Sequence, residues 1–240
     1  MIFDINLGVG VWPFRKLRFT GDPDALVAHL AKNGITGGVM RHYAAEFCAD
    51  LDFVNEELAK SVRPGFLPAF AVRPDYKQWK TLPAKVVSLY PSFHSYGLND
   101  PETLEMAHGL AARGVVLHLI LREEDERSHH LRCRIPPVPT ADIEAFADAV
   151  PEAKIVLVNS ISELGLIAKH ANLYGDMASF EPFDVKKALA GLPGDRLLFG
   201  SHTPIYTTLS AVRKLERADL AAELLAAIHT GNAEKVYGRV

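Results

Sequence analysis

Polar residues follow short apolar runs at several places in this 240-residue chain. The clearest case is the run from Leu197 to Phe199, which is too short for a helix and is followed by Gly-Ser, His202 and Pro204. This pattern is typical of a buried strand that stops where a ligand could bind. Because an imidazole titrates near neutrality, His202 is a candidate general base.

The same pattern supplies further candidates. Carboxylate, imidazole and amide groups can move a proton or stabilise an oxyanion, and a guanidinium can bind a carboxylate by two hydrogen bonds. Asp4 could instead bond only backbone amides, and His118 could be a satisfied core histidine. The candidate catalytic residues are His202, His118, Asp4, Asn159 and Asn6, and the candidate substrate-binding residues are Arg41, Arg73, Arg122, His94 and Tyr90.

The elements that must position these residues are eight apolar runs that alternate with helical stretches. Parallel strands need crossover helices and bury both faces, and eight such units close into a barrel with its reactive groups at the carboxyl ends of the strands. We therefore predict one α/β domain over residues 1–240, a (β/α)8 TIM barrel. A doubly wound dinucleotide-binding sheet is not favoured, because no helix starts at Gly8 and Gly10. The predicted strands are 1–5, 35–40, 66–72, 85–90, 115–121, 154–158, 173–178 and 196–200.

The composition argues against several kinds of partner. The chain has 26 basic and 29 acidic residues and a net charge of -3, which gives no reason to expect nucleic acid or an anionic membrane surface. Cys48 and Cys133 form neither a metal-binding spacing nor a disulfide framework, and no signal-peptide pattern or long apolar run occurs. We therefore expect a cytoplasmic protein whose partner is a small-molecule substrate. The segment from Trp12 to Phe14 fits either a substrate wall or a contact in a homo-oligomer.

Five segments, taken in order, resemble one protein family. The family is the amidohydrolase superfamily, in particular its amidohydrolase-related (amidohydrolase 2) branch, which also holds decarboxylases and lactonases. The resemblance covers nearly the whole chain and implies the same barrel. The segments are Phe3 to Gly8, Val116 to His118, Ile155 to Asn159, Phe199 to Pro204 and Gly231 to Gly238.

The resemblance also implies that the usual metal site of this family is replaced here. The family carries two histidine ligands on its first strand, where this chain has Asn6 and Gly8. The family's sixth-strand histidine corresponds to Asn159, and its eighth-strand aspartate corresponds to His202. Of the ligand positions, only His118 has the residue type that the family has there. Glycine has no ligand atom, and an amide oxygen is a poorer zinc ligand than imidazole. We therefore expect no cofactor.

The favoured hypothesis is a hydrolase or lactonase that acts on a small carboxylated molecule without the family's standard metal centre. His202 would be the general base, and Asp4, on the same strand face as Asn6, would orient it. Asn6, Asn159 and His118 would donate hydrogen bonds to the reacting group. The three candidate arginines would hold the substrate carboxylate by paired hydrogen bonds.

Two alternatives remain. In the first, His118, His202 and Asp4 form a rebuilt site for one divalent metal such as zinc, which would serve a metal-dependent hydrolase or decarboxylase. In the second, the barrel has lost catalysis and binds a small molecule. The second alternative ranks lower, because so many of the replaced positions remain polar.

Overall fold

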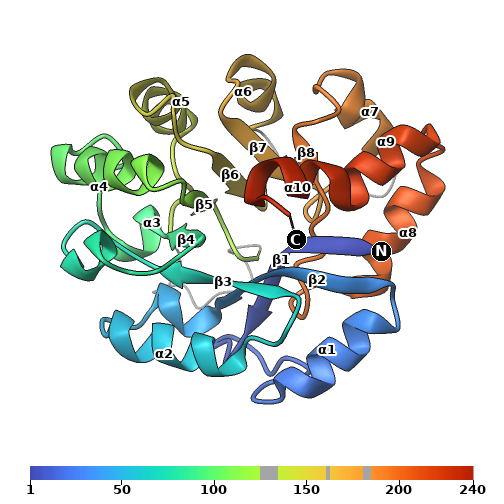
Figure 1. Cartoon of the computed structure of the whole chain (residues 1–240), viewed down its shortest axis with the longest axis horizontal. Coiled ribbons are helices and arrows are strands. Elements are labelled where there is room, and N and C mark those ends of the chain that lie inside the picture. The colour runs from blue at the N-terminus through green and yellow to red at the C-terminus, as the bar shows by residue number, and fades with distance from the viewer. Residues whose placement is uncertain (125–134, 161–162, 181–184, 240) are drawn as a thin grey trace.

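The computed structural model describes residues 1–124, 135–160, 163–180 and 185–239. Its eight strands are all parallel and follow one another in chain order around a single sheet. Figure 1 looks along this barrel, with the helices arranged outside the strands. The predicted (β/α)8 architecture is therefore confirmed. The strands are β1 (Ile2–Val9), β2 (Ile35–His42), β3 (Phe66–Ala71), β4 (Val86–Leu89), β5 (Val116–Ile120), β6 (Ile155–Val158), β7 (Leu173–Asp176) and β8 (Leu197–Leu198).

The barrel closes where the last strand meets the first. The amide of Ile5 donates to the carbonyl of Phe199 at 2.9 Å, and the amide of Gly8 donates to the carbonyl of Thr203, also at 2.9 Å. Strand β8 is only two residues long, shorter than the predicted run of residues 196–200. The closure therefore depends on the segment after β8, which also carries His202.

Helices connect the strands, and local sequence signals fix their starts. The carboxylate of Asp22 accepts a hydrogen bond from the amide of Ala25 at 2.9 Å, and Pro23 occupies the first helical position, as predicted. Among the described residues, no helix combines the length and apolar character needed to cross a membrane. The α-helices are α1 (Pro23–Ala31), α2 (Leu51–Ser61), α3 (Pro91–His94), α4 (Pro101–Ala112), α5 (Thr140–Ala149), α6 (Leu164–Lys169), α7 (Val185–Ala190), α8 (Thr208–Arg217), α9 (Ala222–Ala226) and α10 (Asn232–Tyr237).

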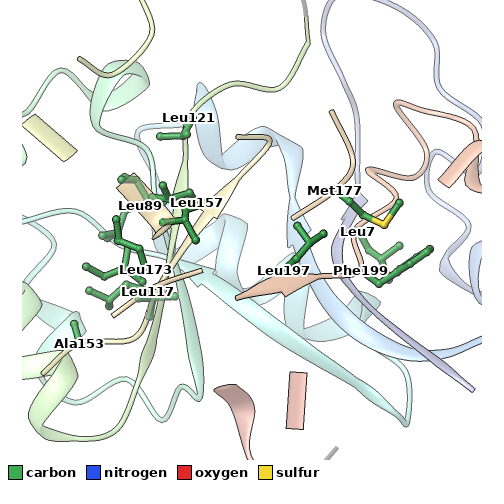
Figure 2. Packing of buried hydrophobic residues seen from close by; sticks show 14 of the residues in the cluster. Leu7, Leu89, Leu117, Leu121, Ala153, Leu157, Leu173, Met177, Leu197 and Phe199 are labelled. Carbon is green, nitrogen blue, oxygen red and sulfur yellow. The ribbon is translucent and has the colours of Figure 1, made fainter. Parts of the chain in front are cut away.

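Buried apolar side chains form two layers, one on each face of the sheet. The outer layer, part of which Figure 2 shows, includes Leu7, Leu117 and Leu157 and packs the strands against the helices. The inner layer fills the barrel and includes Phe3 and Val156. Because successive residues of a strand point to opposite faces, both layers are supplied by the same strands. Apolar residues thus fill the barrel toward the amino ends of its strands, and polar groups occupy the end where the carboxyl ends of the strands lie.

A bulge in β1 interrupts this alternation. The pairing with β2 shifts register between Asp4 and Leu7. Leu7 therefore packs in the same layer as Ile2, although an unbroken strand would place residues 2 and 7 on opposite faces. Bulges re-aim side chains next to functional sites. This bulge separates Asn6 from Asp4, which the sequence pattern had placed on one strand face.

Gly8 provides a stability test of the packing at the end of β1. A Cβ atom at this position would overlap the buried ring of Tyr43. We expect Gly8→Ala to lower the free energy of unfolding by about 1–3 kcal/mol, as overpacked cores do. Gly165→Ala is the control, because a Cβ at this helical position meets nothing within 4 Å. Urea unfolding measures both variants, and equal stability of the two would contradict the prediction.

Candidate active site

A fully buried ion pair lies at the carboxyl end of the barrel. Arg41, near the end of β2, donates from Nε to Oε1 of Glu123 at 2.9 Å and from Nη2 to Oε2 at 2.6 Å. Glu123 comes three residues after the end of β5. The ring of Tyr43 lies 5.6 Å from the guanidinium carbon. Two parallel hydrogen bonds compensate both charges, which could not otherwise be removed from water.

The remaining contacts of Arg41 gather side chains from other strands. Its Nη1 donates to Oδ1 of Asn6 at 2.6 Å, and its Nη2 lies 3.1 Å from Nδ1 of His202. Asn6 Nδ2 donates to Asn159 Oδ1 at 2.8 Å and to Asp176 Oδ2 at 2.5 Å. We call this group the Arg41 cluster, and its members are Asn6, Arg41, Glu123, Asn159, Asp176 and His202.

The cluster forms because its members lie in or directly after six parallel strands, β1, β2, β5, β6, β7 and β8, toward the carboxyl end of the barrel. Asn159 directly follows β6, Asp176 is the last residue of β7, and His202 follows β8. Asn159 has a φ of 60° and His202 a φ of 56°. Non-glycine residues in this left-handed region cost about 1–3 kcal/mol each and persist where their surroundings hold them, commonly at functional sites. The strained backbone is therefore a second indication of function.

His202 is a neutral imidazole with defined hydrogen-bond directions. Its Nε2 lies 2.6 Å from the carbonyl oxygen of Glu123, so Nε2 carries the hydrogen and donates it. Nδ1 then accepts from Arg41 Nη2. Burial lowers the pKa of His202 to about 4, with Glu123 opposing that shift. The lone pair on Nδ1 is therefore present at neutral pH and faces the middle of the cluster.

Three further carboxyl groups hold protons unusually tightly. Burial raises the pKa of Asp4 to about 7 and that of Asp176 to about 6. Burial, together with the neighbouring carboxylate of Glu123, also raises the pKa of Glu46 well above its ordinary value. Burial opposes ionisation of Glu123, but the charge and hydrogen bonds of Arg41 outweigh it and hold the pKa of Glu123 below its usual value. The Arg41 ion pair thus fixes one ionised carboxylate among carboxyl groups whose pKa values are raised.

The structure leaves two predicted catalytic residues outside the Arg41 cluster. His118 Nε2 lies 2.7 Å from the hydroxyl of Tyr237. It pairs with Val156, three residues before Asn159, and so lies about 10 Å below the cluster along the barrel. Asp4 Oδ1 accepts from the amides of Asn6 and Ser201, each at 3.0 Å. The expected contact between Asp4 and His202 is not formed, because the bulge in β1 turns Asp4 away.

Of the predicted substrate-binding residues other than Arg41, Arg122 lies nearest the cluster. Its carbonyl accepts from Asn159 Nδ2 at 2.7 Å, its side chain is 34% exposed, and its Nε has no hydrogen-bond partner among the described residues. Arg73 instead pairs with Asp75 at 2.7 Å near the surface. His94 Nε2 lies 2.7 Å from the carbonyl of Ala45. Tyr90 is completely buried, with its ring 5.4 Å from that of His94.

Sequence reasoning identified Asn6, Arg41, Asn159 and His202 in the cluster and missed the role of Glu123. The charged run from Arg122 to Arg127 has the composition of a solvated loop. Residues 125–134 lie outside the described residues, so the structure describes only Arg122, Glu123 and Glu124 of this run. One signal could have identified Glu123, since it is the first acidic residue after the end of a barrel strand.

Solved structures with the same fold include members of the amidohydrolase 2 group. An amidohydrolase 2 from Bifidobacterium longum subsp. infantis is 18% identical with a TM-score of 0.64, and the match covers 100% of both chains. A dihydroxybenzoic acid decarboxylase from Polaromonas sp. JS666, solved with manganese and 2-nitroresorcinol, is 14% identical with a TM-score of 0.74, covering 100% of this chain and 98% of that one.

An amidohydrolase from Burkholderia multivorans is 14% identical with a TM-score of 0.69, and the match covers 100% of both chains. No protein-family model and no curated protein sequence matches the chain. At these identities the likeness establishes the fold alone, a (β/α)8 barrel. Fold does not fix a reaction, so the function must be argued from the Arg41 cluster.

The described residues do not fit the divalent metal that this fold often carries. The positions that the resemblance assigns to metal ligands are Asn6, Gly8, His118, Asn159 and His202, and His118 lies about 10 Å below Asn159 along the barrel. The first and last of these positions bond the guanidinium of Arg41, and the ring of Tyr43 fills the space beside Gly8. No group of three or more His, Cys, Asp or Glu side chains suited to a metal occurs in the described part of the chain. A positive guanidinium at this point would also repel a cation.

Removing one partner of the buried ion pair tests its importance. We expect Glu123→Gln to lower the free energy of unfolding by about 3–5 kcal/mol, because Arg41 would remain charged and uncompensated. The double variant Arg41→Met, Glu123→Leu should lose less, since no charge is left buried. Asp24→Asn is the control, because Asp24 makes the same two-bond pairing to Arg63 in an exposed position. Urea unfolding measures the loss of stability in each variant. The prediction is refuted if Glu123→Gln loses no more stability than Asp24→Asn.

The raised pKa of Asp4 predicts a pH dependence of stability. Burial raises this pKa from 3.8 to about 7, so the folded protein binds the proton more tightly than the unfolded chain. The resulting stabilisation grows as the pH falls from about 7 toward 3.8 and is lost as the pH rises. Relative to Asp4→Asn, the wild type should gain up to about 1.4 kcal/mol per pH unit in this window. Urea unfolding at both ends of the window measures the difference, and identical pH slopes would contradict the prediction.

Proposed function

We propose that this chain is a divergent amidohydrolase-related enzyme, a metal-independent hydrolase of a small carboxylated ester or lactone. The observation that carries the proposal is the guanidinium of Arg41, bonded to Asn6 and His202 at the carboxyl end of the barrel. Active sites of TIM-barrel enzymes lie at this end. A fixed positive charge there can stabilise an oxyanion, as a metal does in other enzymes.

Two arginines bind different parts of such a substrate: Arg41 binds the oxyanion and Arg122 binds the carboxylate. Four hydrogen bonds use four of the five N–H groups of Arg41, and one N–H on Nη1 is left without a partner among the described residues. This N–H is the donor for the developing oxyanion. Arg122 follows β5, its carbonyl accepts from Asn159 Nδ2, and its guanidinium lies 3.8 Å from Glu163 through Nη2. Its Nε has no hydrogen-bond partner among the described residues, and this guanidinium pairs with the substrate carboxylate.

His202 accepts the proton of the attacking water. Its Nε2 hydrogen is directed at the carbonyl of Glu123, so the accepting nitrogen is Nδ1, where the attacking water takes the place of Arg41 Nη2 as the hydrogen-bond donor. Because burial lowers the pKa of His202 to about 4, the basic form is fully present at neutral pH. A weak base suits an ester or lactone, whose carbonyl needs less activation than that of an amide.

A substrate screen separates this proposal from its alternatives. Lactones, esters and aromatic acids are incubated with the protein, with and without a chelator. The proposal expects hydrolysis that the chelator does not affect. Release of carbon dioxide from an aromatic acid would favour decarboxylation, the reaction named for several structures of this fold. Thermal stabilisation by a ligand without turnover would favour a binding protein.

A variant of His202 tests the role of the base. We expect His202→Gln to lower kcat by about 100- to 10,000-fold on a hydrolysed substrate, the usual contribution of general base catalysis. In the wild type, kcat/KM should fall only as the pH drops toward about 4, the pKa of His202. His108→Gln is the control, since His108 pairs with Glu152 on the surface. Turnover by folded His202→Gln at the parent rate would exclude this mechanism.

A variant of Arg122 tests the substrate contact. We expect Arg122→Gln to raise KM for carboxylated substrates by about ten-fold or more, with a smaller change in kcat, because a charge-assisted contact outside the reacting centre is lost. A matched ester without the carboxylate should show no such change in KM. Steady-state kinetics of both substrates measures the difference, and an equal effect on the two would remove Arg122 from carboxylate binding.

A further inference from the structure

The segment between β1 and α1, residues 10–21, reaches across the carboxyl end of the barrel. Its Trp12 donates from Nε1 to Oε1 of Glu124 at 2.8 Å, and its Arg15 donates from Nε to Oε2 of the same carboxylate at 3.1 Å. Arg15 also donates from Nη2 to the carbonyl of Ile205 at 2.8 Å. Glu124 comes after β5 and Ile205 comes after β8. The segment therefore connects the end of β1 to the chain that follows two other strands.

The inner side of this segment packs on residues that touch the Arg41 cluster. The rings of Trp12 and Tyr43 lie 5.7 Å apart, and the ring of Tyr43 lies 5.6 Å from the guanidinium carbon of Arg41. Trp12 and Leu17 of the segment form a small buried apolar group with Tyr43 and Ile205, separate from the two layers of the barrel. The segment therefore lies over the Arg41 cluster, with apolar side chains on its inner side.

The Arg41 cluster itself is closed to solvent. Arg41 is 2% exposed and Glu123 is 1% exposed, and the other four members have no exposed surface at all. A molecule from solution cannot contact these side chains unless part of the chain moves away. Enzymes commonly meet this requirement with a loop that opens to admit a molecule and closes to exclude water. The burial of the cluster therefore requires a movable segment above it.

Glycines at both ends of residues 10–21 suit such a movement. Gly10 has a φ of 85° and Gly21 a φ of 74°, in the left-handed region that favours glycine. At Gly10 a Cβ atom would also lie 2.4 Å from Nε2 of His42, so a side chain has no room there. Hinges are a few loop residues, often small, that absorb a large change in backbone angles. The two glycines therefore mark the ends of one segment that can move as a unit.

We propose that residues 10–21 form a lid over the Arg41 cluster, which opens about its two end glycines and is held closed by Glu124. Opening breaks the hydrogen bonds from Trp12 and Arg15 to Glu124 and leaves the cluster open to solution. The outer side of the lid carries the exposed cations Arg15, Lys16 and Arg18, and the segment has no acidic residue, so it attracts anions such as carboxylates. The lid controls access whatever reaction follows, and therefore goes beyond the proposed hydrolase activity.

Chemical labelling of His202 tests the lid on the whole protein without a substrate. Diethyl pyrocarbonate attaches a carbethoxy group to each neutral imidazole that it can reach, and peptide mass spectrometry gives the rate at each histidine. In the wild type, His202 should be labelled much more slowly than His108, whose side chain is 49% exposed. We expect Arg15→Met to speed the labelling of His202 by about five-fold or more, the scale of one lost hydrogen bond to a charged group. Trp12→Phe keeps an aromatic ring, removes the other donor to Glu124 and should act in the same direction.

Two controls separate lid opening from other effects. Lys16→Met removes the neighbouring exposed cation and should leave the labelling rate of His202 unchanged. His118 lies about 10 Å below the cluster, so lid opening leaves it unlabelled, whereas unfolding of the whole barrel exposes it together with His202.

Three results would overturn the lid. The first is labelling of His202 at the parent rate in both Arg15→Met and Trp12→Phe. The second is labelling of His118 in step with that of His202, because access would then come from unfolding. The third is labelling of His202 as fast as that of His108 in the wild type. None of these results depends on turnover, so failure of the lid and failure of the proposed hydrolase activity are distinguished.

Discussion

The buried pair of Arg41 and Glu123 is the interaction on which the carboxyl end of the barrel depends. Neither charge could remain inside the protein without the other, since an uncompensated buried charge costs several kcal/mol. The pair spans from β2 to the segment after β5, and the donors that remain on Arg41 hold Asn6 and His202. The position of one guanidinium therefore fixes the directions of side chains from several strands. Removing it would leave their hydrogen bonds unsatisfied as well as Glu123 unpaired.

The same pair explains the protonation of its neighbours. Glu123 already neutralises much of the charge of Arg41, and burial outweighs the attraction that Arg41 and Lys214 still exert on the carboxylate of Asp176. Burial then raises the pKa values of Asp4, Asp176 and Glu46, while it lowers that of His202. Acid and imidazole groups are both driven toward their neutral forms by the same loss of solvent. The region thus combines one fixed ion pair with neutral groups that can exchange protons.

The sequence predicted the barrel well, because apolar runs and helix caps depend on local patterns that read directly from the chain. It also placed Asn6, Arg41, Asn159 and His202 together, since the carboxyl ends of parallel strands meet. Three features depended on information that is not local. The bulge in β1 reversed the expected face of Asp4 relative to Asn6, and the strand register set the depth of His118. Glu123 lies in a charged run, and because such a composition is typical of a solvated loop, it did not indicate a buried site residue.

The fold constrains where charge is needed more than which group supplies it. Structures of this fold include one solved with manganese, whereas this chain has a guanidinium bonded to residues at two positions that the resemblance assigns to metal ligands. A guanidinium cannot be lost by chelation and donates hydrogen bonds in fixed directions, but it cannot lower the pKa of a bound water as a metal does. Proton transfer must then be arranged by side chains. His202, a neutral imidazole bonded to Arg41, is a group that can meet this requirement.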